Sequence, residues 1–352
     1  MDQEARNCIL RYACGLTACV ALAFAFEWTL AHMTPILAGA FLANRGPRPD
    51  LKTTLVVLLA IVVILGGGFL VTVFLYPYPL VFLLLFCSGL YSNYYRAVTG
   101  RSGFLVLLFT LAVLLMPLLG GTSTGLAYEV FKGFLLSAFV ALAVVQVAHT
   151  VFPSRLPAPP KPPLPSPDNA AASAWLSTAV VLPFALVCLL FNLTGMVLAL
   201  IMIAMLSQKP DFSTGAAGGK ALLAANVGGG LVAIAFYQLL LINPSYPFAI
   251  VGIFSMALLF SARLFSDRPT APLYATAFNT VLILVGSSTS AMGGEADANF
   301  YTRIVQILLA VCYAVGAFAL LDSLRIRQRI LGIGDSVVAM LHRAARWLPG
   351  GT

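Results

Sequence analysis

Charged side chains are scarce in this chain. Only 9% of its 352 residues are Asp, Glu, Lys or Arg, whereas apolar residues make up 60%. This balance lies far outside the range of soluble globular proteins and is typical of chains that cross a membrane many times. It predicts an all-α integral membrane protein whose main partner is the lipid bilayer. The charged residues are distributed along the series of apolar segments. Nucleic acid is therefore not expected as a partner despite a net charge of +8.

Sequence motifs of nucleotide-dependent and hydrolytic enzymes are missing as well. The chain has no P-loop, no G-x-S-x-G, no H-E-x-x-H and no carboxylate pair in a recognisable catalytic frame. The six cysteines lie in apolar segments without a C-x-x-C pair or ligands at metal-binding spacing, and they are interpreted as small apolar residues. We therefore expect no enzymatic activity, no metal and no cofactor.

Twelve apolar segments can be marked along the chain, on the basis that a span needs about 20 apolar residues. The first follows a short charged start, Met1 to Asn7, and lacks a clear small-residue cleavage site, so we expect it to be retained as a span. The second segment of each half is short. The expected spans are 8–27, 29–44, 52–75, 79–96, 103–119, 126–151, 172–191, 193–207, 217–241, 247–265, 270–287 and 300–322.

Basic residues predict the orientation of these spans, because Lys and Arg favour cytoplasmic loops. They cluster near the start of the first segment, in alternate connections after it, and at the C-terminus. As a result, 18 of the 20 basic residues fall on one side, and only Lys132 and Arg303 fall on the other. Both termini and the centre of the chain are therefore predicted to be cytoplasmic.

The two halves of the chain resemble each other. Arg48-Pro49-Asp50 and Lys209-Pro210-Asp211 each open a loop that leads to three consecutive glycines, and further matched pairs follow in the same order. Each half has an even number of spans with its basic loops on the same side, so the repeat is parallel. The expected domains are a first six-helix membrane repeat (1–152), a proline-rich cytoplasmic linker (153–171), a second six-helix repeat (172–322) and a basic amphipathic tail (323–352).

Hydroxyl and charged residues gather at the predicted outward side of each half. Hydroxyls beside a cation suit a carboxylate that gives up its water. The expected substrate-binding residues are Lys132, Arg303, Thr122, Ser123, Thr124, Ser288, Thr289, Ser290, Phe131 and Tyr301. In the alternative interpretation the hydroxyls only form loops, while Lys132 and Arg303 reach the interface or pair with Glu129 and Asp297.

Glu129, Glu27 and Asp322 are the candidates for proton coupling, and His32 borders the same outward turn as Glu27. Each carboxylate can equally be an interfacial residue in water. His149, near the inner end of the sixth span, is interpreted as a packed or capped histidine.

The chain resembles the fusaric acid resistance and aromatic acid exporter family. The features that carry the resemblance are Leu10-Arg11 before an apolar span, the Glu27-Trp28 turn, Thr34-Pro35 in a short second span, the basic loop from Arg45 to Lys52, and Arg303 at the start of the last span. The resemblance implies a protein of the bacterial inner membrane that exports aromatic and related organic acids, often with a periplasmic adaptor of the membrane-fusion type. Larger relatives carry a cytoplasmic domain where this chain has only the proline-rich linker.

The leading functional hypothesis is export of a hydrophobic organic anion driven by proton motive force. Two alternatives stay open: a passive organic-anion channel, since the family is similar to plant malate-type anion channels, and a scaffold that holds an envelope complex in the membrane. A homo-oligomer is also left open.

Overall fold

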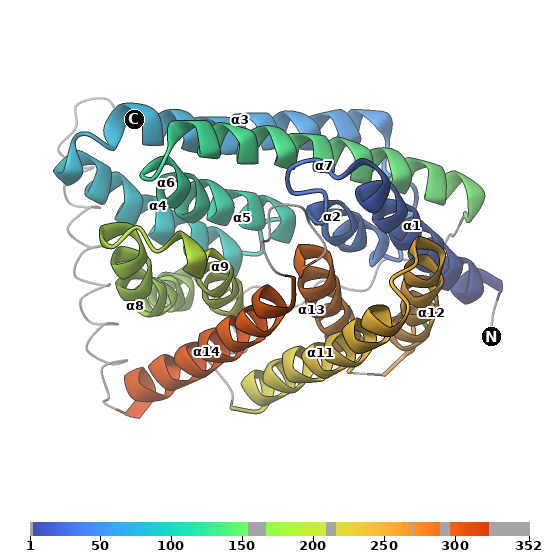
Figure 1. The fold of residues 1–352 in the computed structure, drawn as a ribbon. Coiled ribbons are helices and arrows are strands. Elements are labelled where there is room, and N and C mark those ends of the chain that lie inside the picture. The colour runs from blue at the N-terminus through green and yellow to red at the C-terminus, as the bar shows by residue number, and fades with distance from the viewer. Residues whose placement is uncertain (1–2, 154–166, 209–215, 269, 289–295, 324–352) are drawn as a thin grey trace, which may run out of the picture. The chain divides into compact units, whose positions relative to one another are not determined.

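The computed structural model describes residues 3–153, 167–208, 216–268, 270–288 and 296–323 (Figure 1). All regular secondary structure in these ranges is helical, which confirms the predicted all-α class. Most of the proline-rich linker and nearly all of the predicted amphipathic tail lie outside the described residues.

The first half of the chain forms the helices expected from its apolar segments. A continuous helix runs from Gly103 to Gly120 and consists of α5, the π-helical turn η1 and α6. The helices are α1 (Gln3–Phe26), α2 (Met33–Leu42), α3 (Leu51–Leu75), α4 (Pro79–Val98), α5 (Gly103–Thr110), η1 (Leu111–Leu115), α6 (Met116–Gly120) and α7 (Thr124–Val151).

The second half follows the same order of long and short helices. The helices are α8 (Pro167–Leu190), the 3₁₀ turn η2 (Thr194–Met196), α9 (Val197–Leu206), α11 (Ala216–Ile242), α12 (Tyr246–Leu264), α13 (Ala271–Ser288) and α14 (Ala296–Ser323). Predicted and observed ends differ by only a few residues in most cases.

Seven helices in the described part of the chain are long and apolar enough to cross a membrane. In contrast, α2 and α9 have 10 residues each. At a rise of 1.5 Å per residue, a helix of this length extends about 15 Å, roughly half of a bilayer core. Neither α2 nor α9 can therefore cross a bilayer as a helix on its own. The expected total of twelve spans stays a prediction.

The chain divides into two compact units that each combine segments from both halves of the sequence. Unit 1 comprises Met1–Gly67, Ser123–Lys161 and Lys220–Leu308, and unit 2 comprises Gly68–Thr122, Pro162–Gly219 and Leu309–Thr352. Three of the boundaries between the units fall inside helices, namely α3, α11 and α14.

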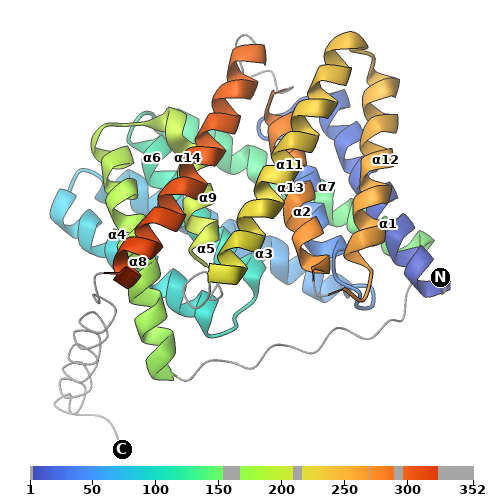
Figure 2. The same ribbon diagram turned by 90° about the horizontal axis from the view of Figure 1, so that it is seen from below.

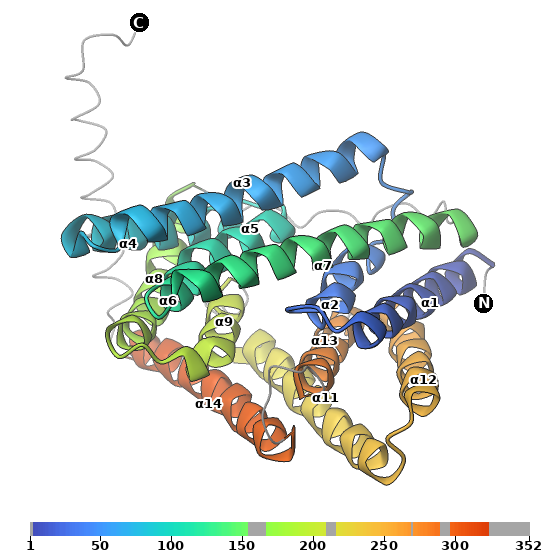
Figure 3. The same ribbon diagram turned by 45° about the horizontal axis from the view of Figure 1, so that its top comes forward.

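In unit 1, the short helix α2 lies at the centre. It packs against α1, α7 and α13, while α12 packs against both α1 and α13 (Figure 2). The N-terminal part of α3 lies beside α7 (Figure 3), where the Thr54 hydroxyl accepts a hydrogen bond of 2.7 Å from Gln146. The core of this unit contains apolar side chains such as Leu37 and Leu42 of α2, which are almost completely buried.

In unit 2, α9 is the short buried helix. It packs against α8 and against η1, and α4 packs against α8 and α5. Tyr94 of α4 is fully buried and donates a hydrogen bond of 3.3 Å to the carbonyl of Ala204 in α9. Each unit thus contains one half-length helix that is enclosed by longer ones.

Candidate functional site

Lys132, one of the two outward cations predicted to bind substrate, lies on an exposed face of α7. Its ammonium is 2.8 Å from Glu129 Oε1, and the two side chains are 57% and 47% exposed. The same ammonium lies 5.8 Å from the centre of the Tyr128 ring. Pairing with Glu129 corresponds to the alternative interpretation of Lys132, although an exposed pair of this kind is weak enough to exchange partners.

The neighbouring hydroxyls bind backbone groups at the end of α6 and the start of α7. The Thr122 hydroxyl donates to the Leu118 carbonyl at 3.3 Å, and the Ser123 hydroxyl accepts from the Leu126 N–H at 3.5 Å, which caps the helix. Thr124 is the first residue of α7. Phe131, on the next turns of α7, lies next to Gly66 of α3.

The second predicted cluster falls largely outside the described residues. Thr289 and Ser290 belong to a range that the structure does not describe. For four further predicted residues the backbone is helical but the side chains are not described: Ser288, Tyr301, Arg303 and Asp322. The matched role of the two outward cations therefore stays a prediction.

The Glu27-Trp28 turn, which joins α1 to α2, is held firmly against α7. Trp28 Nε1 donates to the Ser137 hydroxyl at 2.9 Å, and that hydroxyl donates to the Leu30 carbonyl at 2.9 Å. Gly133, one turn earlier on α7, faces the backbone of Thr29 so closely that no Cβ fits. The exposed Glu27 has a positive φ of 43°, a conformation that helps the chain to leave α1.

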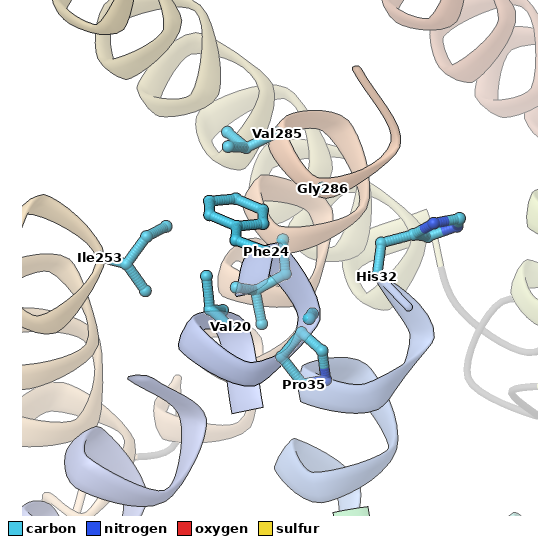
Figure 4. A pocket seen from close by; sticks show the side chains of 9 residues that line it. Val20, Phe24, His32, Pro35, Ile253, Val285 and Gly286 are labelled. Atoms are coloured by element: carbon cyan, nitrogen blue, oxygen red, sulfur yellow. The ribbon is translucent and has the colours of Figure 1, made fainter. Parts of the chain in front are cut away.

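An apolar pocket lies beside this turn, between α1, α2, α12 and α13 (Figure 4). Phe24 lies at its centre and Ile253 on one side, and the imidazole of His32 extends away from it on the other side. The full lining is Val20, Ala23, Phe24, His32, Pro35, Ile253, Leu282, Val285 and Gly286. The room inside this pocket is about that of one water molecule, so it is too small for an aromatic ring as it stands. Its apolar lining supplies no group to neutralise a charge.

The most unusual residue of unit 1 is Arg11, whose side chain is 0% exposed. Its Nη2 donates to the Asn44 carbonyl at 2.8 Å and lies 3.8 Å from Cys8 Sγ, and its Nη1 lies 3.2 Å from His149 Nδ1. Because a guanidinium only donates, His149 Nδ1 must be the acceptor in this arrangement. Arg11 Nε has no hydrogen-bond partner.

No carboxylate of the described residues forms a salt bridge with Arg11. Its contacts are a backbone carbonyl, a thiol and an imidazole. The Asn44 carbonyl follows directly after α2, where the partial negative charge of a helix C-terminus lies. This partial charge and the hydrogen bonds explain why a buried guanidinium is tolerated here, but within the described residues no counter-ion balances its full positive charge.

The corresponding place in unit 2 is neutral. Ser177 of α8 is buried, and its hydroxyl donates to the Ser207 carbonyl, directly after α9, at 2.8 Å. Both short helices thus end at a buried side-chain donor from the long helix that precedes them in the chain. Only the donor in unit 1 is charged.

Unit 2 instead contains a network of neutral polar groups. Asn93 Nδ2 and Gln208 Nε2 both donate to the Thr110 hydroxyl, at 2.7 and 2.5 Å, and this hydroxyl donates to the Val106 carbonyl at 2.8 Å. Thr110 directly precedes the π-helical turn η1. Asn93 Oδ1 is buried without a hydrogen-bond partner. The network joins α4, α5 and the end of α9 without introducing charge.

Sequence reasoning did not predict the burial of Arg11, which it counted among the inner basic residues and among the features of the family resemblance. The available signal was its position inside the first predicted span, three residues after Cys8 and surrounded by apolar residues. The interpretation of His149 as a packed histidine is confirmed, since the side chain is only 5% exposed, but its partner Arg11 is 138 residues away and carries no sequence signal.

A family model described as "Protein of unknown function (DUF2955)" matches residues 8–148 of this chain. The matched region begins in α1 and ends in α7. No curated protein and no solved structure matches the chain.

Proposed function

We propose that this protein is a membrane transporter that exports hydrophobic organic anions, with aromatic carboxylates as the leading substrate class. The observation that carries the proposal is the pair of half-length helices, α2 and α9, which are buried at the centre of their units and end at buried polar groups. Discontinuous helices with polar ends at membrane depth are a recurring feature of transporter binding sites.

A parallel repeat of two six-helix halves is part of this proposal. The helix α1 packs against α12, and α4 packs against α8. In the proposed repeat, α1 corresponds to α8 and α4 to α12. Both contacts then join the first long helix of one half to the fourth helix of the other half. The positive φ values of Glu27 and Asn192, 43° and 49°, also occur at matching places, shortly after α1 and α8. The family model that ends at residue 148, before the linker, supports a boundary between the halves.

The chemical character of the substrate follows from unit 1. Arg11 provides a buried positive charge that favours an anion, and the apolar helices around it favour a hydrophobic one. The small pocket beside the Glu27-Trp28 turn would have to widen to accept an aromatic ring. On the outward side, Lys132 and Arg303 with the nearby hydroxyls are proposed to receive the carboxylate, and Glu129, Glu27 or Asp322 to carry a proton.

The cellular setting belongs to the same proposal. We place the protein in the bacterial inner membrane with both termini in the cytoplasm, on the distribution of its basic residues. A periplasmic adaptor of the membrane-fusion type is the proposed protein partner. For an inside-negative membrane, outward movement of one negative charge is favoured by about 2.3 kcal/mol per 100 mV, so the potential alone can drive export.

The proposal is tested by flux measurements on the purified protein in liposomes. Vesicles loaded with radiolabelled benzoate are expected to lose it faster when the protein is present and the potential is negative inside. Lys132→Ala and Arg303→Ala should each slow this flux, whereas Arg101→Gln, an exposed arginine of unit 2, serves as the matched control.

Unlabelled benzoate on the opposite side should accelerate exchange in a carrier and have no such effect in a passive channel. If no carboxylate in a panel of aromatic acids shows protein-dependent flux, the transport function is wrong. Normal flux in both outward variants would reject only the outward site.

A further inference from the structure

We propose that Arg11 is the carboxylate-binding group of an internal substrate site at the basic end of unit 1, an inference that rests on the proposed organic-anion transport. Four features support this proposal. The guanidinium of Arg11 is completely buried, it has no carboxylate partner in the described residues, and its Nε has no hydrogen-bond partner. The fourth feature is an excess of basic residues on the surface at this end of unit 1.

The free hydrogen-bonding capacity of Arg11 lies on one edge of its guanidinium. A guanidinium has five N–H donors, and Nε and Nη2 lie on the same side, where they can bind both oxygens of a carboxylate in parallel. On this edge Nε has no partner, and Nη2 contacts Asn44 O and the weakly accepting Cys8 Sγ. A carboxylate that docks here pairs with Nε and competes with Asn44 O and Cys8 Sγ for the hydrogens of Nη2.

The other side of the guanidinium is held in place. His149 Nδ1 accepts from Nη1, and the carbonyl after α2 accepts from Nη2, so the planar group has a defined orientation before any substrate arrives. Preorganisation of this kind reduces the entropy that is lost on binding. His149 is thus a positioning residue, while Arg11 is the group that contacts the anion.

Basic residues surround the end of unit 1 that leads to Arg11. Their side chains are exposed or half-exposed, and the nearby carboxylates in the described part of the chain are fewer: Glu4, Asp50 and Asp267. The basic residues are Arg6, Arg45, Arg48, Lys52, Arg263 and Arg268. An excess of positive charge around an entrance raises the local concentration of anions and their rate of arrival.

The segment from Ala43 to Asp50 contacts Arg11 through the Asn44 carbonyl and is held by polar contacts that are exposed or partly buried. Arg45 donates to the Ser266 carbonyl at 3.2 Å and lies 3.6 Å from Asp267, and Arg48 Nε donates to Gln146 Oε1 at 2.7 Å. Gln146 Nε2 also donates to the Pro49 carbonyl at 2.8 Å. Entry of a substrate to Arg11 in this proposal requires the segment to open toward the basic end and to break these contacts.

Binding of benzoate to the purified full-length protein provides the first test. Arg11→Gln is expected to weaken benzoate binding by about 10- to 100-fold, as expected for charged hydrogen bonds, and Arg11→Lys should recover only part of the affinity because it lacks the planar fork. Benzamide, which has the same shape without the charge, should not compete. Arg101→Gln is the control. Equal affinities for wild type and Arg11→Gln would overturn the site.

A second test avoids any change at Arg11, in case its variants do not fold. In a protein that retains Cys8 as its only cysteine, an anionic methanethiosulfonate reagent should label Cys8 faster than a cationic one, and benzoate should slow the reaction whereas benzamide should not. Preference for the cationic reagent, or no protection by benzoate, would reject the site.

The two proposals fail in different ways. If benzoate flux in liposomes is normal in Arg11→Gln and Cys8 labelling ignores benzoate, the internal site is wrong while transport stands. If the wild-type protein neither binds nor moves any tested aromatic carboxylate, the transport function fails as well.

Discussion

Replacement of Gly133 by alanine is the sharpest structural prediction, because two effects of known sign oppose each other at this position. Gly133 lies inside α7, where alanine would normally stabilise a helix by about 1 kcal/mol. A methyl group here would overlap the backbone carbonyl of Thr29 in the turn between α1 and α2. Backbone cannot rotate away as a flexible side chain does, so either the turn or α7 must move.

The turn has little freedom to do so. Trp28 and Leu30, on either side of Thr29, are both hydrogen-bonded through the Ser137 hydroxyl, at 2.9 Å each. Overpacking of a tight contact costs about 1–3 kcal/mol, and this cost offsets or exceeds the helix gain. We therefore expect Gly133→Ala to lower the free energy of unfolding by about 0 to 2 kcal/mol.

Gly67→Ala is the matched control. Gly67 lies inside α3, and a Cβ built on it meets nothing within 4 Å, so this substitution should give only the helix gain of about 1 kcal/mol. Unfolding of both variants is measured by titration with sodium dodecyl sulfate in mixed micelles, with loss of helix as the readout. If Gly133→Ala proves as stable as Gly67→Ala or more so, the tight docking of the turn on α7 is wrong.

Three further predictions use the same unfolding assay. Ser177→Ala removes the hydrogen bond to the carbonyl after α9 and should destabilise the protein by about 1 kcal/mol; an unchanged midpoint would show that this end of α9 is satisfied in another way. Thr110→Val keeps the side-chain shape but leaves the amides of Asn93 and Gln208 without this acceptor, at about 1–3 kcal/mol for the buried Asn93 donor and less for the half-buried Gln208, and a neutral result would contradict the network. Lys132→Ala breaks only an exposed pair and should change stability by less than about 1 kcal/mol, so that any larger loss of benzoate flux in this variant reports on function rather than folding.

The helices could be predicted almost completely from the sequence. In lipid, every backbone N–H and C=O must be satisfied within the segment, so a long apolar run becomes a helix whatever its neighbours are. Proline and glycine then set the ends, as at Pro79, the first residue of α4. The brevity of α2 and α9 was also visible, in the two short apolar segments 29–44 and 193–207.

The candidate site could be predicted only in part. Lys132 was identified because it violates the distribution of the other basic residues, and its exposed pair with Glu129 was anticipated as the alternative interpretation. The distinct environment of Arg11 was not anticipated. Charge counting treats an arginine near a span end as a loop residue and says nothing about how far the surrounding helices bury it.

By itself, the sequence determined the class of the protein, the places of its helices and the scarcity of charge that makes each buried cation significant. Only the tertiary structure decided which helices pack together, and hence that α1, α7 and the end of α2 meet around Arg11. The physical reason is that lipid-facing and protein-facing side chains are equally apolar, so helix packing in membranes depends on close fit and on a few polar contacts between distant residues, which composition and periodicity do not record.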